Sequence, residues 1–161
     1  MDIPLIEQVK IQAQVLVPLV KALQAELGEE RANVIVRRAL GDLYRKYGER
    51  WWPTQGARNL GEKVASAFEM FAAGDALEYK VVKEEPDVLE LNVTECRYAE
   101  FYQKIGAPEL GFLLTCSADT DFFHAEGFGA NVRLTVTQTI MQGASHCDFR
   151  YTLKKNKQNT Q

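Results

Sequence analysis

Hydrophobic and polar positions divide the chain into a helical first half and a second half rich in strands. Apolar residues recur every three or four positions over residues 5–27, about 29–47 and about 59–74, which predicts three helices. Pro18 interrupts the first of these patterns and predicts a kink or a break there. The predicted helix ends are Gly28, Gly48 and Gly74.

An alternation of period two replaces the helical period after Ala76. Apolar residues alternate with polar ones over 77–81 and again over 89–93, and the acidic turn between them predicts a β-hairpin. Two further runs, 134–140 and 146–151, flank a short connection containing Gly143 and predict a second hairpin.

Two short helices are predicted between these hairpins. Thr94 is the expected cap of the first helix, which runs from Glu95 to Ile105, and the second helix runs from Pro108 to Cys116. The layout is therefore α+β, with N-terminal helices followed by an antiparallel sheet of two hairpins and two short inserted helices.

The chain length favours a single domain. Its 161 residues predict one α+β domain over residues 1–153, with a helical part at 1–74 and a sheet part at 75–153 that carries the site. Residues 154–161, rich in Lys, Asn and Gln, are predicted to fray. The apolar N-terminal helices leave a surface on which a homodimer could form.

Composition narrows the class of protein. A hydrophobic share of 46% and a charged share of 25% are typical of a soluble globular protein, and a net charge of −3 gives no basic footprint for nucleic acid. No apolar run approaches the roughly 20 residues that cross a bilayer, and no signal peptide is visible, so we expect no membrane contact and a cytoplasmic location. Three cysteines, an odd number, indicate thiols rather than a disulfide framework.

The three cysteines fall near the seam between the predicted sheet and the inserted helices, where a pocket is expected. Cys96 would sit in a first helical turn, where free N–H groups and the helix dipole lower the pKa of a thiol and favour a nucleophilic thiolate. Cys116 would lie near a helix C-terminus, with Asp119 three residues on as a proton carrier. Cys147 alternates with Phe149 along a strand. The alternative for each cysteine is an inert, small core residue.

Together these residues resemble a known family. The carrying motifs are Thr94-x-Cys96, Gly106-x-Pro108-Glu109-Leu110, Cys116-x-x-Asp119, Thr137-Gln138-Thr139-Ile140-x-x-Gly143 and Cys147-Asp148-Phe149-Arg150. Over residues 75 to 153 they are similar to the L-2-amino-thiazoline-4-carboxylic acid hydrolases. The resemblance implies a hydrolase acting on carbon–nitrogen bonds of a cyclic amidine or isothiourea, such as 2-aminothiazoline-4-carboxylate or a related heterocycle.

The resemblance also implies roles for residues of this chain. A thiolate would attack the amidine carbon while Asp119 moves protons; alternatively, Asp119 activates water and the thiols only shape the pocket. The expected catalytic residues are Cys96, Cys116, Asp119 and Cys147, and the expected substrate-binding residues are Thr137, Thr139, Asp148 and Arg150.

One departure from the family concerns charge. The family tends to carry an Arg shortly before its Thr-x-Thr strand and an acidic residue after the glycine, whereas Val136 and Ala144 stand there in this chain. Arg133 is an off-register candidate for the missing cation. If those charges hold the carboxylate and amine of the substrate, this protein acts on a different compound.

Two other hypotheses, a zinc site and a non-catalytic binding domain, remain open. The three thiols with His146, His124 or Asp119 could supply four zinc ligands, but no Cys-x-x-Cys pair is present, so we expect no metal and no other cofactor. The alternative function is a non-catalytic small-molecule binding or sensing domain, because the Gly143 to Cys147 ending also resembles the closing strands of 4-vinyl-reductase-type domains.

Overall fold

The computed structural model describes residues 3–51, 60–118 and 132–153. Three helices come first, α1 (Leu5–Leu27), α2 (Glu29–Trp51) and α3 (Leu60–Ala72). The second half consists of β1 (Leu77–Glu85), β2 (Val88–Cys96), α4 (Arg97–Lys104), α5 (Pro108–Gly111), the π-helix η2 (Phe112–Cys116), β3 (Val132–Val136), the 3₁₀-helix η3 (Ile140–Gln142) and β4 (Cys147–Leu153). The predicted α+β class, with helices preceding an antiparallel sheet, is confirmed. The tail predicted to fray lies outside the described residues.

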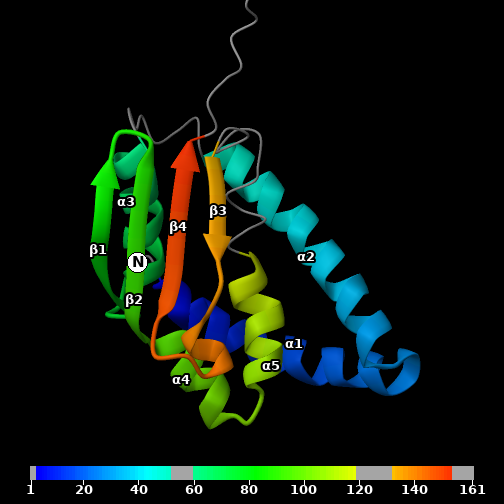
Figure 1. Cartoon of the computed structure of the whole chain (residues 1–161). Helices are drawn as coiled ribbons and strands as arrows, with labels where there is room; N and C mark the ends of the chain where they lie inside the picture. The colour runs from blue at the N-terminus through cyan, green and yellow to red at the C-terminus, as the bar shows by residue number, and fades with distance from the viewer. Residues whose placement is uncertain (1–2, 52–59, 119–131, 154–161) are drawn as a thin grey trace, which may run out of the picture.

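The four strands form one antiparallel sheet in the order β1-β2-β4-β3. Both predicted hairpins are present, and the pairing of β2 with β4 joins them. Leu77 pairs with Cys96 and Val93 pairs with Cys147 at the same end of the sheet. Helices α4 and α5 lie at this end, and α3 lies behind β1 and β2 (Figure 1). The short helices therefore meet the sheet where two of its strands carry a cysteine.

The buried side chains form two clusters. In the first, α3 packs on one face of the sheet, and the ring of Phe68 lies edge-on to Phe149 at a centroid distance of 5.4 Å. The second joins α1 to α4, α5 and η2. Leu77, Cys96 and Ile140 pack against both clusters. These residues mark the seam between the two halves of the core.

Some predicted element ends differ from those observed. Thr94 caps no helix, because the pairing of Glu78 with Glu95 and of Leu77 with Cys96 extends β2 and delays α4 to Arg97. Pro18 lies inside one continuous helix, where its exposed position lets solvent reach the carbonyl freed by its missing N–H. Helix α2 continues past Gly48, since an interior glycine costs a helix only about 1 kcal/mol.

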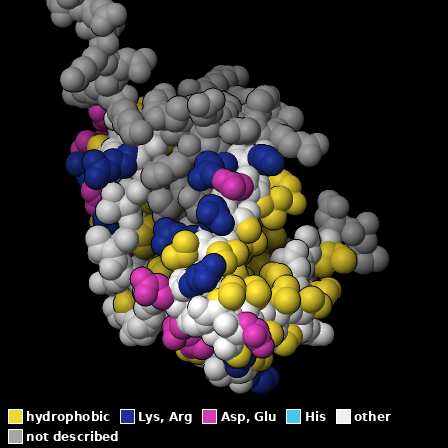
Figure 2. Space-filling model, turned by 90° about the vertical axis from the view of Figure 1, so that its right-hand side faces the viewer, with side chains coloured by type: hydrophobic (Ala, Val, Ile, Leu, Met, Phe, Trp, Pro, Cys, Tyr) yellow, Lys and Arg dark blue, Asp and Glu magenta, His cyan; other side chains and the backbone are white. Residues whose placement is uncertain are grey.

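Helices α1 and α2 form one side of the molecule, and hydrophobic side chains gather on that side (Figure 2). Ile11, Val15 and Leu19 follow one another along α1 at exposed fractions of 61%, 67% and 52%. Within the described part of the chain, no helix combines the length and the apolar character that a membrane span requires.

Candidate functional site

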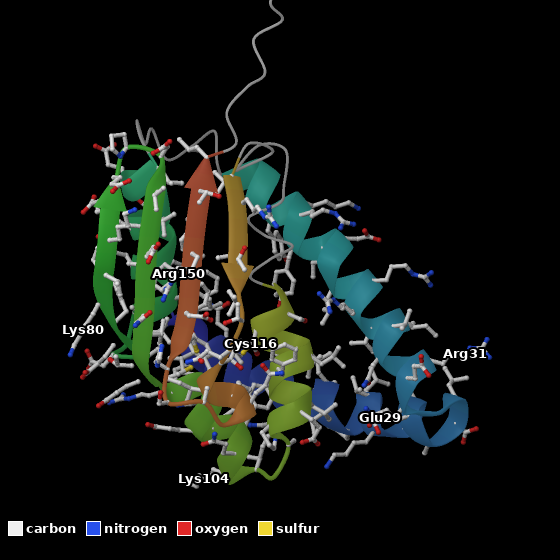
Figure 3. The ribbon with its side chains drawn as sticks, in the orientation of Figure 1. Glu29, Arg31, Lys80, Lys104, Cys116 and Arg150 are labelled. Atoms are coloured by element: carbon white, nitrogen blue, oxygen red, sulfur yellow. The ribbon has the colours of Figure 1, made fainter. Side chains whose placement is uncertain are left out.

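A small cavity of about 60 Å³ lies where the two core clusters meet. Its described walls come from the sheet, α3, α4, η2 and the connection between β3 and β4. Cys96, Cys116 and Cys147 all line it. Figure 3 shows Cys116 between the sheet and the helices beside it. The pocket expected between the sheet and the inserted helices is thus present, and the fold brings three thiols from three separate elements to it.

Cys96 ends β2 and is itself the N-cap of α4. Its backbone is extended, with φ −142° and ψ 104°, and its Sγ accepts a hydrogen bond from the backbone N–H of Ala99 at 3.4 Å. The first N–H groups of a helix have no partner within the helix and carry partial positive charge. A sulfur that accepts such a bond is stabilised in its ionised form. A helix does start beside this cysteine, but at Arg97 rather than at the predicted Glu95, so Cys96 occupies the cap rather than the first turn.

Cys147 begins β4 and is buried, with 6% of its surface exposed. Its Sγ accepts a hydrogen bond from the backbone N–H of Ile140 at 3.2 Å. Side chains alternate across a strand, so Phe149 and Tyr151 share the inward face of β4 with Cys147. This cysteine thus ties the start of β4 to η3 as well as lining the cavity.

Cys116 is the last residue of the π-helix η2, and both Thr115 and Cys116 line the cavity. Segments of π-helix occur frequently at functional sites. Tyr102 of α4 lies against this pair. Burial raises the pKa of Tyr102, its hydrogen bond with Thr115 acts in the opposite direction, and charge on Cys116 raises the pKa further. The phenol therefore remains protonated beside the sulfur at neutral pH.

The rest of the described wall is mainly aromatic, and none of these residues was predicted from the sequence to belong to the site. The aromatic members are Phe68, Phe71, Tyr98, Phe149 and Tyr151. A signal existed for two of them, because Phe149 and Tyr151 share the strand face of Cys147. Tyr98 donates a hydrogen bond to the carbonyl of Phe71 at 2.9 Å, which joins α4 to α3 beside the cavity.

Of the predicted substrate-binding residues, Thr139 alone is placed at the cavity. It is buried and caps η3, because its Oγ1 accepts a hydrogen bond from the N–H of Gln142 at 3.2 Å and donates to the side-chain oxygen of Gln142 at 3.0 Å. Its hydroxyl is therefore engaged in holding the connection between β3 and β4.

Thr137 and Asp148 are not among the described cavity residues and instead bind each other. The carboxylate of Asp148 accepts the N–H of Thr137 at 2.8 Å, the hydroxyl of Thr137 at 2.5 Å and the N–H of Gln138 at 2.9 Å. Partial burial raises the pKa of Asp148, but these hydrogen bonds outweigh it and leave the pKa below its usual value. Asp148 thus organises the chain that leaves β3.

Arg150 also lies away from the cavity, on the opposite side of β4 from Cys147 and Phe149. Its guanidinium donates to the carbonyl of Leu91 at 2.9 Å and to Asn92 at 3.0 Å, and it pairs with Glu90 at 3.5 Å. Figure 3 shows Arg150 on the sheet. These contacts cross from β4 to β2 and support the sheet.

Asp119, the predicted proton carrier, and His124, a candidate zinc ligand, lie outside the described residues. Within residues 3–51, 60–118 and 132–153, no group of three His, Cys, Asp or Glu side chains is arranged to hold a metal ion. The described part of the cavity is therefore a set of three thiols in a mainly apolar wall.

This fold and cavity define an α+β domain with a thiol-lined interior site. The family model of L-2-amino-thiazoline-4-carboxylic acid hydrolase matches residues 8–151, and the chain belongs to this family. The match extends beyond the C-terminal half that the motifs cover and includes the helices.

A solved structure of similar fold is the phenol-responsive sensory domain of the transcription activator PoxR, crystallised with phenol. The TM-score is 0.55 at 12% sequence identity, over 86% of this chain and 72% of that one. No curated protein sequence matches this chain. At this identity the likeness concerns the fold alone.

Proposed function

We propose that this protein is a thiol-dependent hydrolase that opens a small cyclic amidine or isothiourea, such as 2-aminothiazoline-4-carboxylate or a related heterocycle. The observation that supports the proposal is the convergence of Cys96, Cys116 and Cys147 on one cavity. Membership of the family supports the reaction class. Burial alone does not explain this arrangement, because the core of a 161-residue chain offers many separate places for three small side chains.

Cys96 is the proposed nucleophile. Its sulfur accepts an N–H at a helix start, and its side chain is only half-buried, whereas Cys147 is buried and Cys116 ends a helical segment. The N-terminal end of a helix favours a thiolate and the C-terminal end opposes it. Cys116 and Cys147 then shape the pocket around the reacting carbon.

The proposed reaction proceeds in two steps. The thiolate of Cys96 adds to the amidine carbon, and the bond from that carbon to the ring sulfur or ring nitrogen breaks as the leaving atom takes a proton. Water then adds to the same carbon, its oxygen becomes the carbonyl of the product, and the thiolate leaves. One water is consumed and one ring bond is broken. Asp119 remains the predicted proton carrier for both steps.

Serine variants of the three cysteines test this proposal. Cys96→Ser keeps a capping oxygen at the start of α4, so it should fold normally and lose turnover by about 100-fold or more. Cys116→Ser and Cys147→Ser should show smaller losses. Ring opening of 2-aminothiazoline compounds is followed by chromatography and mass spectrometry of the product. Full activity in all three variants would eliminate covalent catalysis and leave Asp119-activated water as the alternative.

A second candidate function is supported by a separate observation. The fold is similar to that of a phenol-responsive sensory domain, and five of the twelve described residues of the cavity wall are aromatic. Under this second hypothesis, the cavity binds a small ligand and does not convert it. Thermal-shift screening of cyclic amidines, thiazolines and phenols, followed by product analysis, separates the two functions, since a ligand that stabilises the protein and is recovered unchanged supports binding alone.

A further inference from the structure

We infer that the ring taken by this cavity carries no carboxylate group. The inference rests on the proposed function and narrows its substrate class to carboxylate-free cyclic amidines and isothioureas. The observation behind it is the chemistry of the wall, because every described side chain that lines the cavity is aromatic, aliphatic, a threonine or a cysteine. Within the described wall, therefore, no Lys or Arg faces the ligand.

Two arginines of the sheet, Arg133 and Arg150, are candidates for a cation, but neither side chain faces the cavity. Arg133 is exposed and pairs with Thr152 across β3 and β4, while its neighbours Val132 and Leu134 are the residues of β3 that face the core. Arg150 lies on the face of β4 away from the cavity and is held by Glu90 and the carbonyl of Leu91. Neither guanidinium is placed to neutralise an anion in the cavity.

The cost of desolvation differs between the carboxylate and the amidinium group of the candidate substrate. A carboxylate that leaves water for an apolar wall without a counter-ion loses its hydration and gains no compensating interaction. An amidinium enters the same cavity opposite the thiolate of Cys96, so the two charges offset each other. The aromatic side chains then contact the faces of the ring, as in other pockets for small planar ligands.

Two compounds with the same ring test the inference. 2-Aminothiazoline and 2-aminothiazoline-4-carboxylate differ by the carboxylate alone, and we expect kcat/KM to be at least about 30-fold higher for the compound without it. Equal values, or a preference for the carboxylate, would overturn the inference even though hydrolysis itself would be established.

A binding experiment keeps the inference separate from the proposed hydrolysis. Thiazole and thiazole-4-carboxylate, which are not substrates, are titrated by calorimetry into the wild-type protein, and both aminothiazolines are titrated into Cys96→Ser. Tighter binding of the carboxylate-free member of each pair supports the inference, even when no substrate is turned over and the hydrolase proposal fails. Equal or tighter binding of the carboxylates, or no binding of any of the four, overturns it.

Discussion

At the scale of single residues, Cys96 and Cys147 each accept a hydrogen bond from a backbone N–H group. The Sγ atom of Cys96 accepts its bond from Ala99, and the Sγ atom of Cys147 accepts its bond from Ile140. Sulfur is a weak acceptor in its thiol form and a much stronger one as a thiolate. Both bonds also have structural roles, since one starts α4 and the other fixes η3 against β4. The Sγ atoms of Cys96 and Cys147 therefore line the cavity and also hold the neighbouring backbone in place.

Asp148 predicts a dependence of stability on pH. Hydrogen bonds from Thr137 and Gln138 hold its pKa below the usual value in the folded protein, against the effect of partial burial. Its contribution to the free energy of unfolding is therefore fully present above the unfolded pKa of about 3.9, and it is lost as the pH falls through the lower folded pKa.

We expect Asp148→Asn to lower the free energy of unfolding by about 1 kcal/mol at pH 7, with the difference from wild type shrinking below about pH 4. Urea denaturation at pH 7, 5, 4 and 3 measures this difference. Asp75→Asn, at an exposed turn where φ is 55° and asparagine is well tolerated, is the control for removing a surface carboxylate. A constant difference across this pH range would contradict the assigned role.

At the scale of elements, the hydrophobic period placed the helices and strands correctly, while contacts between elements decided where they end. The helix predicted from Glu95 starts two residues later, because sheet pairing holds Glu95 and Cys96 in β2. The segment predicted as one helix to Cys116 changes from α5 to the π-helix η2. No local pattern in the sequence marks that change.

Gly111 lies at the junction where α5 ends and η2 begins. A Cβ atom added there would lie 2.5 Å from Cγ of Tyr102 and 2.6 Å from Sδ of Met141. The tyrosine contacts come from the base of its side chain, which cannot swing away. Because Tyr102 also bonds Thr115 beside Cys116, a shift of Tyr102 would reach the cavity.

We expect Gly111→Ala to lower the free energy of unfolding by about 1–3 kcal/mol, although alanine is the better helix former. Urea denaturation measures the change. Glu109→Ala, on the exposed side of the same helix, should alter stability by roughly 0.5 kcal/mol or less. A Gly111→Ala variant as stable as wild type would show that Tyr102 and Met141 can move apart at little cost.

At the scale of the whole molecule, the cavity lies at the seam of two core clusters. Its volume of about 60 Å³ is below the 150 Å³ or so of an engineered cavity that binds benzene. A ring-sized ligand therefore requires the wall to move outward. Motion at a seam costs less than motion within one cluster, because fewer packed contacts cross it.

The sequence predicted the gathering of the thiols but not the chemistry around them. Cys96, Cys116 and Cys147 could be placed near one seam because each falls at an element end or on an alternating strand. The same alternation indicates that Asp148 and Arg150 face away from Cys147, as they do. The aromatic contribution of α3 was not predictable, because it depends on how the helix packs across the sheet.

The exposed side of α1 predicts self-association. Ile11, Val15 and Leu19 are spaced four residues apart and form a continuous apolar stripe. We expect the protein to elute at about twice its 18.2 kDa mass in size-exclusion chromatography with light scattering, and Val15→Glu to return it to a monomer. Val81→Glu, an equally polar change on the exposed strand β1, is the control. A monomeric wild-type protein at high concentration would contradict the homodimer.

The proposed covalent catalysis requires Cys96 to form a bond to the substrate. Rapid quenching of wild-type protein with 2-aminothiazoline, followed by peptide mass spectrometry, tests it directly. Because ring opening releases no fragment, the account predicts an adduct equal to the mass of the substrate on the peptide that contains Cys96, absent from Cys96→Ser. Turnover by Cys96→Ser at the wild-type rate, with no adduct on any cysteine of the wild-type protein, would contradict it.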